Sequence, residues 1–253
     1  MKRATYVYGL VSSGRRPRLG RIPRGLPGAG PVRLLDLDGG LWLVVADVPL
    51  PRYSAATINR RLSDLDWVAE LAVEHESVVE AFLDSAALLP MKLFTIFSSD
   101  ERAVAHVAAD RRRLSALLRR VAGRVEYGVR LVFEPAPART SLKARAQPAS
   151  GAAYLTRKKA ERDLSAELAE RARSTAAGVF GRLERRAVSS RRRTSPDGAA
   201  RDAPLLLDAT FLVPRARSSA FRAAAAREQR AIGGAGYRVI VSGPWPAYSF
   251  IQE

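Results

Sequence analysis

The sequence contains no cysteine, which excludes disulfides, thiolate catalysis and zinc ribbons that depend on cysteine ligands. It also has no apolar run that approaches the roughly eighteen residues needed for a membrane helix. The apolar stretch YVYGLV at residues 6–11 is too short for the hydrophobic region of a secretory signal, and it is rich in strand-forming residues. We therefore expect an intracellular protein that does not enter a membrane.

Motifs for nucleotide binding and nucleophilic catalysis are missing as well. The sequence has no GxxxxGK[ST] phosphate loop and no GxSxG elbow that would place a serine for attack. The glycines of PGAGP (27–31) are followed by a proline instead of the helix that a dinucleotide fingerprint requires. The sequence thus predicts no cofactor and favours a protein that is not an enzyme.

Histidine is scarce, with only His75 and His106 in the whole chain. His75 lies on an apolar helical stripe, where a hydrogen-bonded core role is favoured over a metal or catalytic role, and His106 falls beside the stripe of the next helix. Asp64 and Asp66 open a helix, whose positive end stabilises carboxylates without any catalytic purpose. A hydrolase that depends on His75 and nearby carboxylates is the weakest alternative, and we expect no metal site.

Charge of one sign predominates, with a formal net charge of +17. Basic runs stand at 111–113, 157–159 and 191–193, which keeps a nucleic-acid-binding protein open as the alternative function. Lysine occurs at only five positions, however, so arginine carries nearly all of the positive charge. Aromatic residues make up 7% of the chain and fall mostly inside strand patterns, whereas single-strand binders place exposed aromatics among their basic residues. Solvated arginine-rich surfaces are therefore favoured over a specific nucleic-acid site.

Hydrophobic periodicity and turn signals predict a mixed series of helices and strands. Strands are expected at 4–12, 32–38, 41–48, 88–97, 125–133, 205–214 and 237–243, and helices within 54–87 and at 100–122, 152–187 and 219–232. Gly39 and Gly40 join the second and third strands as a hairpin. Residues 189–204 are poor in apolar side chains, and we expect them to form a loop.

The order of these elements predicts an α+β fold, because helices and strands mix without regular βαβ alternation. Residues 135–151 are rich in proline, alanine, serine and basic side chains and have no periodicity, which is typical of a linker. We therefore expect two domains with mixed or antiparallel sheets and packed helices, one at 1–136 and one at 137–253. The second domain is expected to be ferredoxin-like, with strand 125–133 a candidate to join its sheet.

The end of the chain, SGPWPAYSF, is unusual because chain ends are normally polar. Its candidate residues are Pro244, Trp245, Pro246, Tyr248 and Phe250. One interpretation is a structural tail whose buried aromatics lock the C-terminus, with prolines that limit the unfolded chain. The other is an exposed anchor for a partner, since tryptophan and tyrosine are frequent binding hot spots. The structural interpretation is favoured.

Several stretches together resemble the gas vesicle proteins F and L. They include TYVYGLV near the start, DLDWVAELAVEHESVVEAFL with LLPMKLFTIFSSDE, VEYGVRLVF, SGAAYLTRKKAERD, FLVP and the terminal SGPWPAYSF. The likeness covers nearly the whole chain in consistent order, and the terminal motif is its most specific part. The resemblance implies two α+β domains and a non-enzymatic accessory or minor structural protein of the gas vesicle, a protein-walled organelle in the cytoplasm. It further implies nucleation or assembly of the shell, with the small hydrophobic wall protein and other accessory proteins as partners.

Two positions depart from the family's pattern. Leu93-Phe94-Thr95 stands where the family usually has Phe-Gly-Thr, and Ala247 stands where a second proline is typical. A glycine in place of Phe94 would allow a close backbone approach, so the phenylalanine puts that geometry in question. Both departures indicate a divergent member of the family.

Overall fold

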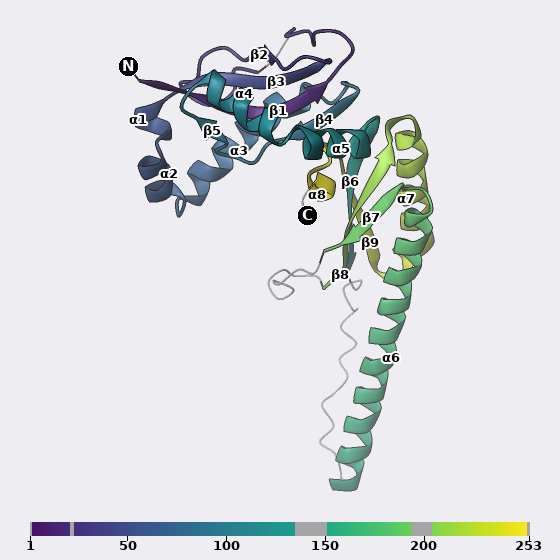
Figure 1. Cartoon of the computed structure of the whole chain (residues 1–253). Helices are drawn as coiled ribbons and strands as arrows, with labels where there is room; N and C mark the ends of the chain where they lie inside the picture. The colour runs from purple at the N-terminus through teal and green to yellow at the C-terminus, as the bar shows by residue number, and fades with distance from the viewer. Residues whose placement is uncertain (1, 21–22, 135–150, 194–203, 252–253) are drawn as a thin grey trace. The chain divides into compact units, whose positions relative to one another are not determined.

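The computed structural model describes residues 2–20, 23–134, 151–193 and 204–251 (Figure 1). The chain divides into two compact units. The first contains Met1–Glu126, Pro214–Ala216 and Pro244–Glu253, and the second contains Tyr127–Val213 and Arg217–Gly243. The domain boundary predicted between residues 136 and 137 lies outside the described residues and stays a prediction.

An antiparallel sheet forms the centre of the first unit. Its strands are β1 (Arg3–Ser12), β2 (Arg33–Asp36), β3 (Leu41–Pro49), β4 (Ala87–Pro90) and β5 (Ile96–Phe97). The order is β2-β3-β1-β4, and β5 also pairs with β1. The predicted hairpin is confirmed, since Arg33 of β2 lies opposite Val45 of β3. The second arm, β3, lies between two other strands, which explains its nearly continuous apolar sequence.

The helices of the first unit are more broken than the sequence predicts. They are α1 (Leu50–Tyr53), α2 (Ala55–Arg61), α3 (Leu65–Glu80), α4 (Asp100–Ala109), α5 (Arg111–Val121) and α8 (Tyr248–Ile251). The expected helix at 100–122 is two helices, because Asp110 has a non-helical ψ of 14° between α4 and α5. The helical block at 54–87 is interrupted before α3, which starts where the Asp64 carboxylate accepts the amide hydrogen of Trp67 at 3.1 Å.

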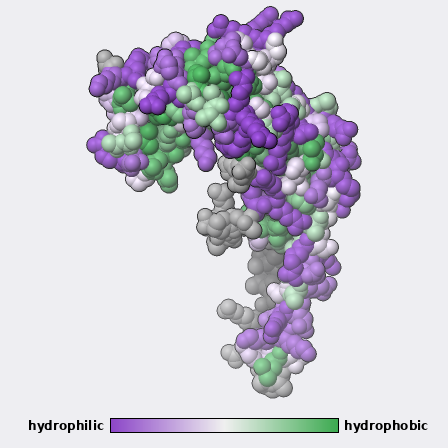
Figure 2. Space-filling model, in the orientation of Figure 1, coloured by the Kyte–Doolittle hydropathy of each residue, from purple (hydrophilic) through white to green (hydrophobic). Residues whose placement is uncertain are grey.

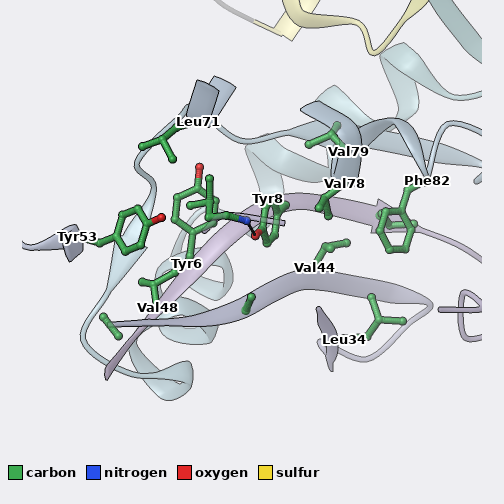
Figure 3. Packing of buried hydrophobic residues seen from close by; sticks show 14 of the residues in the cluster. Tyr6, Tyr8, Leu34, Val44, Val48, Tyr53, Leu71, Val78, Val79 and Phe82 are labelled. Atoms are coloured by element: carbon green, nitrogen blue, oxygen red, sulfur yellow. Dashed lines mark hydrogen bonds between the residues drawn. The ribbon is translucent and has the colours of Figure 1, made fainter. Parts of the chain in front are cut away.

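Helices cover both faces of the central strand β1, whose residues Ala4–Val11 are all buried. Tyr6 and Tyr8 on one face pack against α3 side chains that include Leu71, Val78 and Val79 (Figure 3). The other face is covered by α4 and α5, which contact β1, β4 and β5. The predicted apolar stripe that carries His75 is thus the core-facing side of α3, where Leu71, His75, Val78 and Val79 are all buried.

The second unit has a ferredoxin-like topology, as predicted. It contains most residues of β6 (Arg124–Phe133), α6 (Gly151–Glu184), β7 (Ser189–Arg192), β8 (Leu205–Pro214), α7 (Ser218–Ile232), the 3-10 turn η2 (Gly233–Ala235) and β9 (Tyr237–Trp245). The short 3-10 helix η1 (Arg215–Arg217) follows β8 and lies mostly in the first unit. The βαββαβ series forms a four-stranded antiparallel sheet in the order β7-β8-β6-β9. Strands β6 and β7, which α6 connects, are therefore separated by β8, and strands β8 and β9, which α7 connects, are separated by β6.

Strand β7 is a correction to the sequence analysis, which predicted a loop from residue 189. Ser189–Arg192 has no apolar side chain, yet Ser190 pairs with Phe211 and Arg192 with Ala209 of β8. Backbone pairing at the edge of the sheet therefore forms this strand without hydrophobic alternation.

Candidate functional site

The terminal motif begins in the last, largely exposed residues of β9 and ends in the short helix α8, where Phe250 is buried. Trp245 at the end of β9 is 38% exposed, and Pro244 is exposed as well. Pro246 and Ala247 are buried, and Phe250 of α8 is completely inaccessible to solvent. Ala247, where a second proline is typical of the family, is 2% exposed and therefore fits the buried turn. The structure thus divides the predicted residues into a buried anchor and an exposed tryptophan.

Two glutamates hold the tail in place. The Ser249 amide and hydroxyl donate to the two carboxylate oxygens of Glu126, at 2.7 and 2.6 Å. Glu126 on β6 is only 3% exposed, so these hydrogen bonds compensate a buried carboxylate. The Tyr248 hydroxyl donates to Glu76 of α3. Both contacts are made within the first unit and support a structural role for α8.

Burial sets the acid–base character of the second contact. It raises the pKa of Glu76, and the hydrogen bond from Tyr248 opposes that rise. Burial is also the main reason why the pKa of Tyr248 is raised, with the Glu76 hydrogen bond adding to it. The Tyr248 hydroxyl therefore stays protonated and can donate to Glu76. This pair holds the chain end and offers no activated nucleophile.

His75 lies in the core, as its position on the apolar stripe predicts. It is 4% exposed, and its Nδ1 atom is 2.8 Å from the hydroxyl oxygen of Tyr6. That oxygen also accepts the amide hydrogen of Phe94, so its own hydrogen is free to be donated to a neutral imidazole. Burial lowers the pKa of His75 to about 4.

The other candidate groups stay apart from His75. His106 is exposed on α4, where its ring lies 5.1 Å from that of Phe97. Asp64 caps α3, in agreement with its predicted role. Within the part of the chain that the structure describes, no three His, Cys, Asp or Glu side chains are grouped so that they can hold a metal ion.

The backbone at Phe94 has a φ of +66°, in the left-handed region that glycine favours. Phe94 therefore does not exclude the conformation that the family's usual glycine would allow. Its ring stacks on Trp67 at a centroid separation of 5.5 Å, and its amide hydrogen bonds to Tyr6. These contacts offset a backbone strain of about 1–2 kcal/mol.

The first two basic runs lie on α5 and α6, and the third covers the end of β7 and Arg193 directly after it. In the first run, Arg111 donates to the carbonyl oxygens of Leu37 and Asp38, and Arg113 pairs with Asp110. Arg157 in the second pairs with Glu161 one helical turn away. These contacts show that several of the runs' charges have structural partners. No helix among the described residues is long and apolar enough to cross a membrane.

Comparison with known proteins identifies one family over nearly the whole chain. The model described as "Gas vesicle synthesis protein GvpL/GvpF" matches residues 4–252. Gas vesicle protein L of Streptomyces sp. (strain CB03234) is 33% identical, with 98% of this chain and 92% of that protein covered. Gas vesicle protein F of the same strain is 26% identical, with 98% and 100% covered.

Two solved structures have the same fold. The crystal structure of GvpF from Anabaena sp. PCC7120 matches with a TM-score of 0.71 and 17% identity, covering 99% of this chain and 97% of that one. GvpF from Microcystis aeruginosa matches with a TM-score of 0.68 and 15% identity, covering 99% of both chains. At these identities the structural likeness shows the fold.

Proposed function

Because the chain belongs to the GvpL/GvpF family of gas vesicle proteins, we propose that it acts in nucleation or assembly of the gas vesicle shell. It is a gas-vesicle-associated protein of a structural or accessory family that is not a known enzyme family. The match over residues 4–252 carries the proposal. In this role it binds the small hydrophobic wall protein and other accessory proteins at the gas vesicle, a cytoplasmic organelle.

An exposed apolar surface on the first unit supports a hydrophobic partner. Leu65 and Val73 of α3 are 77% and 67% exposed, and Leu62 just before that helix is 48% exposed. Ala69 and Ala72 are also exposed, and their spacing from Leu65 places them on the same side of α3. Figure 2 shows hydrophobic residues at the surface around α2 and α3. We call these five residues the α3 outer stripe, and propose that it contacts the wall protein.

Co-purification with the wall protein tests this proposal. Tagged protein from cells that form gas vesicles is expected to capture the wall protein, and Leu65→Glu with Val73→Glu is expected to reduce capture at least about tenfold, since the charges would have to be desolvated. Leu164→Glu with Leu168→Glu on α6 is the matched control, because these leucines are also exposed, at 57% and 51%. If the α3 variant captured as much wall protein as the wild type does, the α3 outer stripe would not be part of the interface. No capture by the wild type would contradict binding itself.

A further inference from the structure

A cleft lined by arginines lies between α6 and α7 of the second unit. Its volume is about 620 Å³, and it is lined by Arg182, Arg185, Arg186, Ala224, Arg227, Glu228 and Ala231. Four of the seven lining residues are arginines and one is a glutamate, so the local formal charge is +3. Figure 2 shows mainly hydrophilic residues on the visible surface of this unit.

Among the described residues, one of the four guanidinium groups has a carboxylate partner. Arg182 Nε and Nη2 donate to the two carboxylate oxygens of Glu228, each at 2.8 Å. Arg185, Arg186 and Arg227 are exposed and form no ion pair with any carboxylate of the described residues. Three accessible guanidinium groups therefore lie around the Glu228 carboxylate, which Arg182 already holds in a bidentate pair. Bidentate pairing is the strongest way in which arginine binds a carboxylate.

Small residues leave room for these side chains. A Cβ atom added at Gly178 would lie 3.0 Å from Arg182 Nη1, and one at Gly181 would lie 4.0 Å from Arg185 Nη1. Each arginine follows its glycine by four residues, so it extends back over a bare part of α6. A glycine inside a helix lowers its stability by about 1 kcal/mol relative to alanine. The stability of α6 alone therefore does not explain the two glycines, whereas the space they leave for the arginine side chains does. On the α7 side, Ala224 and Ala231 flank the charged residues.

From this arrangement we propose that the α6–α7 cleft binds a carboxylate-rich segment of a partner protein. Incoming glutamate or aspartate side chains would occupy the three unpaired guanidinium groups and rest their methylene groups on the alanines. A peptide is favoured over a nucleic acid because no aromatic side chain lines the cleft for base stacking. The site does not depend on the α3 outer stripe or on the identity of the partner there.

Fluorescence anisotropy with a short labelled peptide rich in glutamate tests the site at about 0.15 M salt. Replacing Arg185, Arg186 and Arg227 together by alanine is expected to weaken binding at least about tenfold. The control replaces Arg162, Arg217 and Arg222 by alanine, which removes the same charge from exposed positions outside the cleft. This control is expected to change the affinity less than about twofold, because distant surface charges are screened.

The Glu228→Gln variant is expected to bind the peptide more tightly than the wild type does. It frees Arg182 from its internal carboxylate, so the glutamate peptide should bind about threefold more tightly, which loss of folding would not produce. Equal weakening by both triple variants, or no binding at this salt concentration, would overturn the proposal. Tighter binding of a single-stranded oligonucleotide with the same dependence on the three arginines would overturn it as well, in favour of a nucleic-acid site.

Discussion

Replacing Phe250 by alanine is expected to lower the free energy of unfolding by about 3–5 kcal/mol, the usual cost of deleting a fully buried phenyl ring. Phe250 has no solvent exposure, and the hydrogen bonds of Ser249 and Tyr248 hold its helix to Glu126 and Glu76. Urea unfolding monitored by circular dichroism measures this loss.

Trp245→Ala provides the control on the same tail. Its side chain is 38% exposed, so truncation is expected to cost less than about 1 kcal/mol. If Phe250→Ala left stability unchanged, the tail would not lock the C-terminus, and a docking role for the whole motif would be favoured. If Trp245→Ala alone impaired vesicle formation in a stable protein, that tryptophan would belong to a partner interface.

Acid is expected to destabilise the protein through His75. The pKa of this histidine is lowered from 6.5 to about 4 in the fold, so between these values the unfolded chain binds a proton that the folded chain excludes. The stabilising contribution is fully present above pH 6.5 and is lost as the pH falls towards 4. By about pH 4.5 the loss of this contribution amounts to about 2–3 kcal/mol. Tyr6 and Tyr8 face the imidazole and stay neutral throughout, since burial raises the pKa of each.

Comparison of urea unfolding at about pH 7 and pH 4.5 isolates this effect when wild type and His75→Gln are measured together. Glutamine can still accept the Tyr6 hydrogen but does not titrate, so the wild type should lose about 2–3 kcal/mol more than the variant. Glu76, whose pKa is raised by burial, is present in both proteins, so its contribution cancels in the difference. His106→Gln should behave like the wild type, because His106 is exposed. Identical pH profiles for His75→Gln and wild type would contradict a buried neutral imidazole.

Periodic apolar residues made the main elements predictable from the sequence. The apolar stripe that carries His75 identified the buried side of α3, and Gly39-Gly40 identified the hairpin of β2 and β3. The ferredoxin-like topology followed from the order of elements once residues 125–133 were allowed to join the second sheet. The terminal motif and the neighbouring stretches also indicated the family that the whole-chain match shows.

Other features depend on contacts between distant residues, which periodicity does not contain. Glu126 is an acidic residue in a mainly apolar strand, and its partner Ser249 lies 123 residues later in the sequence. The run at Ser189–Arg192 is a strand only because β8 offers it backbone partners. Phe94 keeps a positive φ because its ring packs on Trp67, so the residue type alone was a poor guide to the backbone.

Deletion of the gene tests the assembly role most directly. The strain should form gas vesicles and carry no second gene of the same family that could substitute. Electron microscopy of the deleted strain should show few or misshapen vesicles, and wild-type protein supplied from a plasmid should restore their number and form. Normal vesicle yield and shape in the deleted strain would contradict a role for this protein in nucleation or assembly.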